Sequence, residues 1–169
     1  MSSDVAHETA IDSMDILGKL LNDKITHTEV TYDLNNIGNI LNSDKIPILL
    51  CSKILKENEP FEHSWDVSSD SISAYISNVL NANLLIVTNV DGIYTRKPEL
   101  EGSKFISKID AKKLLSFEET SIDLKLPSLL LEFGTNCYIV NGKFPERVLS
   151  IIEDSTRDYS FNYTYIKGD

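Results

Sequence analysis

The chain has 169 residues, which is enough for one domain with a substantial hydrophobic core. Its apolar content of 41% and charged content of 25% exclude an intrinsically disordered protein. The formal net charge of −10 disfavours nucleic acid or an anionic membrane as the main partner, because both require a basic surface. No apolar stretch approaches the ~20 residues of a membrane span, and the first ten residues lack the apolar centre of a signal peptide. We therefore expect a cytoplasmic protein that binds neither nucleic acid nor membrane.

The cysteines and histidines do not form a metal-binding pattern. Cys51 and Cys137 each lie in an apolar run, where a reduced thiol packs as a small hydrophobic group. The histidines show no metal-ligand spacing, so no protein-bound metal is expected. His7 falls on a predicted helix and is expected to pack or face solvent, whereas His63, close to Trp65 and Asp66, is placed near the proposed acceptor.

Apolar periodicity predicts an alternation of helices and strands. The elements expected in chain order are helices at 3–21 and 33–41, a strand at 46–51, a polar loop at 56–68, a helix at 70–80, a strand at 84–88, helices at 111–115 and 127–132, a strand at 136–140, a helix at 145–152 and a strand at 164–166. The three longest strands are apolar throughout, which is typical of strands covered on both faces. Residues 104–109 fit neither period. Gly134 is a predicted helix stop.

This order predicts an α/β fold with an open, mainly parallel sheet and helices on both faces. In such folds ligands bind beyond the carboxyl ends of the strands. Two strands end in polar turns, Thr-Asn-Val-Asp-Gly and Val-Asn-Gly, so both turns are expected on one edge of the sheet.

The first stretch with chemical potential is 65–72, in which Ser68, Ser69 and Asp70 open a helix. Hydroxyls and free amides at a helix start form an anion site, and a carboxylate there can orient lysines or an amine. Taken alone, this stretch is explained more simply as an ordinary helix cap formed by Ser69 or Asp70.

The second stretch, 88–95, places Asp91 and Gly92 directly after a buried strand. Glycine permits a sharp turn and close approach of a ligand to the backbone. Thr88 adds a hydroxyl, and Tyr94 offers a flat ring for a base or ribose. An ordinary Asp-Gly turn is the alternative.

The third stretch, 140–147, leads from a strand through Asn141 and Gly142 into a helix with Pro145 in its first turn. A purely structural turn explains it as well.

Together these strings resemble the amino-acid-kinase superfamily, which includes acetylglutamate, aspartate and uridylate kinases. The string Thr-Asn-Val-Asp-Gly-Ile-Tyr-Thr resembles its nucleotide-site signature. The strings Ser-Trp-Asp-Val-Ser-Ser-Asp-Ser-Ile, Ile-Asp followed by Leu-Pro, and Val-Asn-Gly followed by Pro-Glu-Arg resemble the archaeal (5-(aminomethyl)furan-3-yl)methyl phosphate kinases of methanofuran biosynthesis. The resemblance implies a three-layer αβα sandwich of the carbamate-kinase type, in one domain whose acceptor-side half spans about 1–82 and nucleotide-side half about 83–169.

The resemblance also implies roles for individual residues. Asp70 matches the aspartate that orients the catalytic lysines. The acceptor-side residues by this resemblance are Asp66, Ser68, Ser69, Asp123 and Asn141. The nucleotide-binding residues by this resemblance are Thr88, Asn89, Asp91, Gly92 and Tyr94. ATP and Mg²⁺ are the implied cofactors, with the metal held mainly by the nucleotide phosphates. A phosphate monoester as acceptor gives a diphosphate product, and a homo-oligomer is expected.

Two departures from the family pattern stand out. Lys97-Pro98 replaces an Asp-Pro pair, and the seven glycines are all isolated, so the family's Gly-Gly-Ser and Gly-Gly-Gly loops and their lysine are not matched. The chain therefore reads as N-terminally truncated, and poor or absent ATP turnover is expected because one lost electrostatic donor costs ~10²–10³ in rate. The alternatives are a nucleotide-binding regulatory module without catalysis, a fragment of such a kinase, or an amino acid or uridylate kinase.

Overall fold

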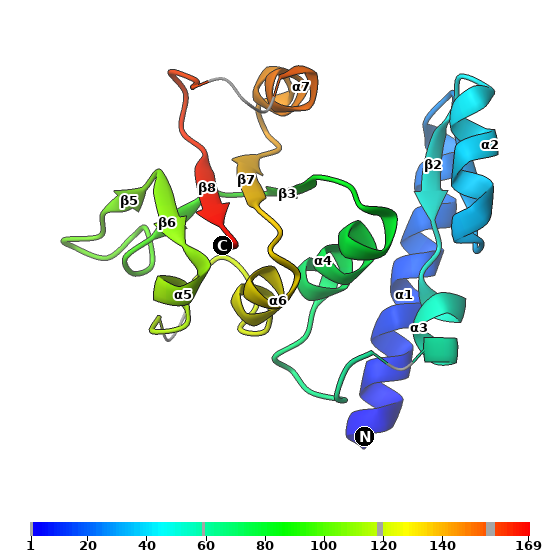
Figure 1. Ribbon diagram of the computed structural model, residues 1–169, viewed down its shortest axis with the longest axis horizontal. Coiled ribbons are helices and arrows are strands. Elements are labelled where there is room, and N and C mark those ends of the chain that lie inside the picture. The colour runs from blue at the N-terminus through cyan, green and yellow to red at the C-terminus, as the bar shows by residue number, and fades with distance from the viewer. Residues whose placement is uncertain (1, 59, 118–119, 155–157) are drawn as a thin grey trace. The chain divides into compact units, whose positions relative to one another are not determined.

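The structure is a computed structural model that describes residues 2–58, 60–117, 120–154 and 158–169. The chain forms two compact units, residues 1–65 and residues 66–169, and each is described by itself (Figure 1). Within each unit the residues contact one another more than they contact the other unit. The predicted halves that meet near residue 82 were defined by chemical role and remain a prediction.

The first unit is built on the long helix α1 (Ser3–Lys24). The Ser2 hydroxyl caps its start by accepting a hydrogen bond from Val5 N–H at 3.4 Å. Gly18 lies buried on the helix, and a Cβ there would stand 2.6 Å from the side chain of Leu50. This close approach lets α1 pack on the strand β2 (Ile46–Leu49), which pairs in parallel with β1 (Thr28–Thr31).

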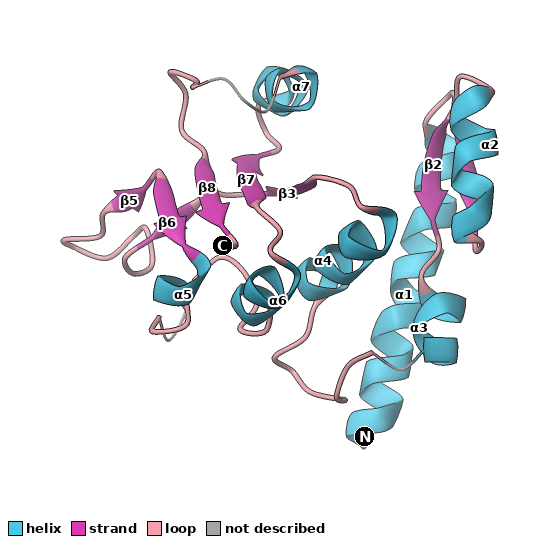
Figure 2. Ribbon diagram, in the orientation of Figure 1, coloured by secondary structure: helices cyan, strands magenta, loops and turns pink. Residues whose placement is uncertain are grey.

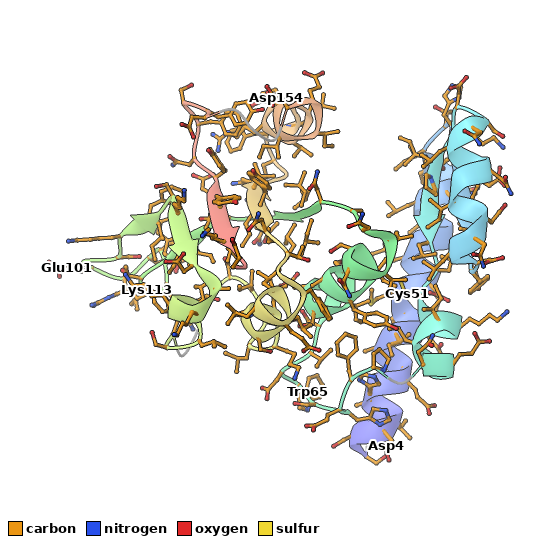
Figure 3. All side chains as sticks on the ribbon, viewed as in Figure 1. Asp4, Cys51, Trp65, Glu101, Lys113 and Asp154 are labelled. Carbon is orange, nitrogen blue, oxygen red and sulfur yellow. The ribbon has the colours of Figure 1, made fainter. Side chains whose placement is uncertain are left out.

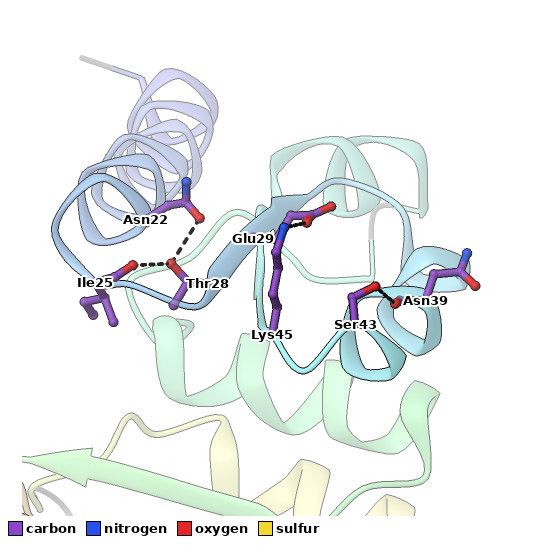
Figure 4. A network of polar contacts seen from close by, with 7 residues as sticks. All are labelled: Asn22, Ile25, Thr28, Glu29, Asn39, Ser43 and Lys45. Atoms are coloured by element: carbon purple, nitrogen blue, oxygen red, sulfur yellow. Dashed lines mark hydrogen bonds and ion pairs between the residues drawn. The ribbon is translucent and has the colours of Figure 1, made fainter.

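Polar contacts fix the connections around these two strands (Figure 4). The Thr28 hydroxyl donates to Ile25 C=O at 2.8 Å, at the turn that follows α1. Lys45, which directly precedes β2, forms an ion pair with Glu29 of β1 at 2.6 Å. The connection between the strands holds a 3₁₀ turn (Leu34–Asn36) and the helix α2 (Ile37–Asn42), which confirms the helix expected at 33–41.

Two sequence expectations for this unit are wrong in detail. The strand at 46–51 is shorter than expected and is not covered on both faces, since Ile46 is 63% exposed. Residues 56–58 belong to the helix α3 (Ser52–Asn58), which was not predicted, and not to a loop. Its apolar face consists of Ile54 and Leu55 alone, too few residues to establish a helical period. The buried carboxylate of Asp15 accepts hydrogen bonds from the N–H and hydroxyl of Ser52, which ties α3 to α1.

The second unit contains a four-stranded sheet in the order β3-β7-β8-β6. Its strands are β3 (Leu84–Thr88), β7 (Cys137–Asn141), β8 (Thr164–Lys167) and β6 (Lys108–Asp110). The pairs β3–β7 and β6–β8 are parallel, and β7–β8 is antiparallel. The mainly parallel α/β architecture predicted from the sequence is confirmed.

Helices cover both faces of this sheet (Figure 2). On one side lie α4 (Ser69–Leu80), the short α5 (Ala111–Leu114) and α6 (Leu126–Phe133), and on the other lies α7 (Pro145–Glu153). Gly134 ends α6 in the left-handed conformation at φ 63°, as the sequence predicted. Fully buried apolar side chains of the sheet and of α6 form the core: Leu126, Leu130, Ile139, Val140 and Ile166.

A small hairpin of β4 (Ile93–Tyr94) and β5 (Phe105–Ile106) joins the end of β3 to β6. The buried hydroxyl of Thr164 accepts from Ile93 N–H at 2.8 Å and donates to Ile106 C=O at 2.6 Å. The segment 104–109 had no clear period because it contains two short strands, β5 and the start of β6, separated by one residue.

Candidate functional site

The two polar turns identified in the sequence lie side by side at one edge of the sheet. Thr88 and Asn141 are register partners at the carboxyl ends of the parallel strands β3 and β7. The N–H of Gly142 donates to Thr88 C=O at 2.8 Å and extends this pairing by one step. A Cβ on Gly142 would stand 2.6 Å from a methyl group of Val87, so glycine permits this close approach.

Asp91 is the centre of a hydrogen-bonded cluster at this edge. Its carboxylate accepts from the Asn141 amide at 3.0 Å, from the Arg147 guanidinium at 3.0 Å and from the Asn162 amide at 3.4 Å. The Arg147 guanidinium also stacks on the Phe144 ring, 3.8 Å from its centroid. The hydrogen bond from Asn141 is the main reason why the pKa of Asp91 lies below its usual value, and burial opposes it only in part. Asp91 is thus an ionised group that locks the turn after β3 to the start of α7.

A pocket of about 280 Å³ lies against the same turn. It is lined by Thr88, Asn89, Val90, Gly92, Tyr94, Arg96, Lys97, Pro98, Glu99, Thr120 and Ser121. Four of the five predicted nucleotide-binding residues are therefore pocket residues, whereas the fifth, Asp91, is engaged with Asn141 and Arg147. The Ser121 hydroxyl donates to Gly92 C=O at 3.1 Å and joins the two walls of the pocket.

Tyr94 stands in this pocket with its ring fixed by packing. Its ring meets Phe105 edge to face, with centroids 5.4 Å apart and planes at 68°. Burial, and to a lesser extent the charge of Asp91, raises the pKa of Tyr94, so the phenol remains a hydrogen-bond donor at neutral pH. An oriented ring with a polar tip can contact a base or a ribose.

Two of the predicted acceptor-side residues, Ser68 and Asp123, form a second cluster, whereas Asn141 belongs to the Asp91 cluster. One carboxylate oxygen of Asp123 accepts from the N–H of Ser68 at 2.8 Å, the hydroxyl of Ser68 at 2.7 Å and the N–H of Ser71 at 3.0 Å. The other oxygen accepts from the Ser71 hydroxyl at 2.6 Å and from Leu126 N–H at 2.8 Å. Asp123 therefore binds the first turns of α4 and α6 together. The N-cap of α4 is Ser68, whose hydroxyl accepts from Asp70 N–H at 3.3 Å, whereas the sequence suggested Ser69 or Asp70 as the cap.

Asp70, the predicted catalytic residue, lies in the first turn of α4 beside this cluster. Its carboxylate accepts from Asp123 N–H at 3.2 Å. Burial and then the charge of Asp123 raise the pKa of Asp70 above its usual value. A half-buried carboxylate held next to a second carboxylate is suited to receive a positively charged partner.

The remaining acceptor-side residues, Asp66 and Ser69, are exposed. The backbone carbonyl of Asp66 accepts from Lys125 N–H at 3.1 Å, which joins the segment before α4 to the start of α6. The structure thus brings Asp91 together with Asn141, and Asp123 together with Ser68 and Asp70.

Several polar residues of these clusters and of the pocket were not predicted as site residues, among them Ser71, Arg96, Ser121 and Arg147. Arg147 could have been identified, because a cation in the first turn of a helix opposes the helix dipole and suggests a carboxylate partner. Ser71, Arg96 and Ser121 could not, since no local sequence pattern distinguishes them; the partner of Ser71, Asp123, lies 52 residues away.

Among the described residues, no helix is both long and apolar enough to cross a membrane.

Comparison with known proteins agrees with this geometry. The model of the amino acid kinase family matches residues 6–141. The chain is 37% identical over 161 residues to [5-(aminomethyl)furan-3-yl]methyl phosphate kinase of Methanocaldococcus jannaschii, which covers 95% of this chain and 72% of that protein. It is 33% identical over 96 residues to uridylate kinase of Pyrococcus abyssi, which covers 50% of this chain and 43% of that protein.

Solved structures show the same fold. Uridylate kinase from Archaeoglobus fulgidus superimposes with a TM-score of 0.70 at 15% identity, covering 98% of this chain and 73% of that one. UMP kinase from Ureaplasma parvum superimposes with a TM-score of 0.66 at 18% identity, and the superposition covers 98% of this chain and 70% of that one. The match of the family model to residues 6–141, together with the 37% identity over most of the chain, shows that this protein belongs to the amino acid kinase family.

Proposed function

We propose that the protein is an ATP-dependent kinase that converts a small phosphate monoester into a diphosphate, with [5-(aminomethyl)furan-3-yl]methyl phosphate as the acceptor. The observation that carries the proposal is the 37% identity over 161 residues to the kinase named for that acceptor. Uridylate is a weaker candidate acceptor, because a uridylate kinase aligned over a similar length, that of Methanocaldococcus jannaschii, is 26% identical. From the similarity to the first of these kinases we also infer that the protein is cytoplasmic and forms a homo-oligomer.

The pocket at the turn after β3 fits the nucleotide. Tyr94 offers a ring to the base or ribose, and Arg96 and Lys97 bring positive charge to the pocket wall. Asp91 acts through Asn141 and Arg147, because its carboxylate holds the turn that shapes this wall. ATP supplies the phosphoryl group, and Mg²⁺ is held mainly by its phosphates.

The Asp123 cluster fits the acceptor side. Four hydrogen bonds from Ser68 and Ser71 to the Asp123 carboxylate fix the start of α4, so the Asp70 side chain stands on a rigid support. In this proposal Asp70 receives a lysine, whose positive charge offsets the cost of keeping the half-buried Asp70 carboxylate ionised. Catalysis of this class depends mostly on such positioning and on charge stabilisation.

A second candidate function is a nucleotide-binding module that transfers no phosphoryl group. The observation that favours it is the isolation of all seven glycines, since these 169 residues contain no glycine-rich loop of the kind that surrounds phosphates.

Nucleotide binding is tested by thermal unfolding with and without MgATP. At a ligand concentration about 100 times Kd, binding to the folded state adds about 2.7 kcal/mol of stability and raises Tm by several degrees. Arg96→Gln, which removes a cation from the pocket wall, should reduce the rise, whereas Lys113→Gln on the exposed surface of α5 should preserve it (Figure 3). The absence of a shift in the parent protein would refute the nucleotide site.

Phosphoryl transfer is tested by incubating the protein with ATP and the aminomethylfuran phosphate. The proposal expects ADP and a diphosphate product, both dependent on the acceptor and both lost in Asp70→Asn, as measured by phosphorus NMR. ATP binding without any diphosphate would favour the non-catalytic module, and diphosphate formation from uridylate alone would favour a uridylate kinase.

A further inference from the structure

The first unit contains a pocket that the nucleotide site does not explain. It has a volume of about 200 Å³ and lies between α1, α3 and the segment after α3. Its lining residues are His7, Glu8, Ile11, Leu55, Lys56, Pro60, Phe61 and His63. All of them belong to residues 1–65.

The lining combines buried apolar side chains, a pair of stacked rings and two exposed charges. Ile11, Leu55 and Phe61 are at most 9% exposed. His7 and His63 stack with ring centroids 4.3 Å apart and planes at 19°, and this pair makes up one wall of the pocket. Glu8 and Lys56 are exposed residues of opposite charge. This arrangement suits a small ligand with a flat ring and two charged ends.

The charges around the wall are arranged in pairs. His63 Nδ1 lies 2.6 Å from the Asp4 carboxylate, and Lys56 pairs with Asp12 at 2.7 Å. Burial, and then the neighbouring His63, lowers the pKa of His7, so this imidazole is neutral at pH 7 and can stack on a ring without charge repulsion. Exposed ion pairs of the Lys56–Asp12 type contribute little, so a ligand phosphate can replace Asp12 at low cost.

Two face-to-face imidazoles do not by themselves make a metal site. Over the described part of the chain, no group of three histidine, cysteine or acidic side chains is placed to hold a metal ion. The pocket therefore calls for an organic ligand with charges complementary to Glu8 and Lys56.

We propose that this pocket binds the phosphate acceptor, a small flat-ring phosphate monoester that carries a primary amine. The ring packs on the wall of His7 and His63, Glu8 receives the ammonium group, and Lys56 binds the phosphate. The position in the chain supports this assignment, since His63 precedes the predicted acceptor-side residue Asp66 by three residues. The inference rests on the proposed kinase function and assigns its substrate specificity to Glu8.

The test compares three probes: [5-(aminomethyl)furan-3-yl]methyl phosphate, the same compound without the amine (furan-3-ylmethyl phosphate), and UMP. Binding is measured by calorimetry, and the ring signals of His7 and His63 are followed by NMR. We expect the amine compound to bind most tightly and to shift both histidine signals. Glu8→Gln should weaken the amine compound about three- to tenfold, the loss typical of an accessible ion pair, and leave the amine-free compound within about twofold. Lys56→Gln should weaken both compounds.

Glu57→Gln is the matched control, because Glu57 is also an exposed carboxylate, lies on α3 at 3.9 Å from Lys53 and does not line the pocket. It should leave all affinities unchanged. Equal weakening of both compounds by Glu8→Gln, or binding that leaves the histidine signals unmoved, would overturn the proposal. These outcomes are independent of the MgATP thermal shift, so a failed acceptor pocket and a failed nucleotide site can be told apart.

Discussion

Asp123 connects the starts of two helices, and its removal should lower the stability of the second unit. Asp123→Ala deletes an acceptor of five hydrogen bonds, which leaves the caps of α4 and α6 unsatisfied. Since one lost helix cap costs about 1 kcal/mol, we expect the unfolding free energy to fall by about 2–4 kcal/mol in urea denaturation. Asp110→Ala is the control, because Asp110 precedes α5 without a capping hydrogen bond from its side chain. Equal losses in the two variants would contradict the dual-cap assignment.

The raised pKa of Asp70 gives a pH-dependent prediction. The folded state binds this proton more tightly than the unfolded chain, so the contribution of Asp70 to stability falls as pH rises through its folded-state pKa. At pH 7 the charged carboxylate is therefore a cost that Asp70→Asn removes, while the amide oxygen can still accept from Asp123 N–H. We expect a higher Tm for Asp70→Asn than for the parent at pH 7, with the difference shrinking toward about pH 4.

Asp110→Asn, at an exposed carboxylate, serves as the control for this series. A parent protein that is as stable as Asp70→Asn at pH 7 would show that burial does not penalise this charge. If Asp70→Asn is more stable but no longer transfers the phosphoryl group, the parent protein keeps the destabilising Asp70 charge because its activity requires it.

Part of the site was predictable at this scale and part was not. The turn with Asp91 and Gly92 was visible because both residues stand in one continuous string that follows an apolar strand. The hydrogen bonds from Ser68 and Ser71 to Asp123 could not be predicted from the sequence, because these residues lie 55 and 52 positions from Asp123. Only the tertiary fold shows that both oxygens of Asp123 are engaged by the chain itself. The predicted acceptor contact of Asp123 thus remains untested.

At the scale of elements, replacing a glycine by alanine in two helices of the first unit should change stability in opposite directions. A Cβ at Gly18 of α1 would stand 2.6 Å from the buried Leu50 and 3.3 Å from Ile48, whereas one at Gly38 of α2 would meet nothing within 4 Å. Gly18→Ala should therefore destabilise by about 1–3 kcal/mol through overpacking. Gly38→Ala should stabilise by about 0.5–1 kcal/mol, because alanine favours the helix. Both values follow from urea denaturation, and a stabilising Gly18→Ala would refute the close packing of α1 on β2.

The elements that the sequence predicted well have a strong and continuous pattern. β3 and β7 are unbroken apolar runs, and the amphipathic period of α4 and α6 extends over at least two turns. β1 was not predicted, because its sequence Thr-Glu-Val-Thr has one aliphatic residue and its stability comes from pairing with β2. β4 and β5 have two residues each and exist only as a pair, so no local pattern can identify them.

At the scale of the whole molecule, the division into two units predicts where a protease cuts first. Trp65 is the only tryptophan, ends the first unit and is 88% exposed (Figure 3). Exposed segments between compact units are preferred sites of limited proteolysis, because a short stretch can open without unfolding a core. Opening here requires loss of the hydrogen bond from Lys125 N–H to Asp66 C=O, while Phe61, four residues earlier, is 9% exposed and shielded.

Brief digestion with chymotrypsin should therefore cut first after Trp65 and give fragments 1–65 and 66–169, identified by mass spectrometry. Trp65→Ser removes the preferred side chain without touching either core, so its first cut should be slower and at another residue. Because the nucleotide pocket lies wholly in residues 66–169, MgATP should protect that fragment from further digestion more than the other. An earlier cut at Tyr32, which is 39% exposed, would mean that the first unit opens before the junction does.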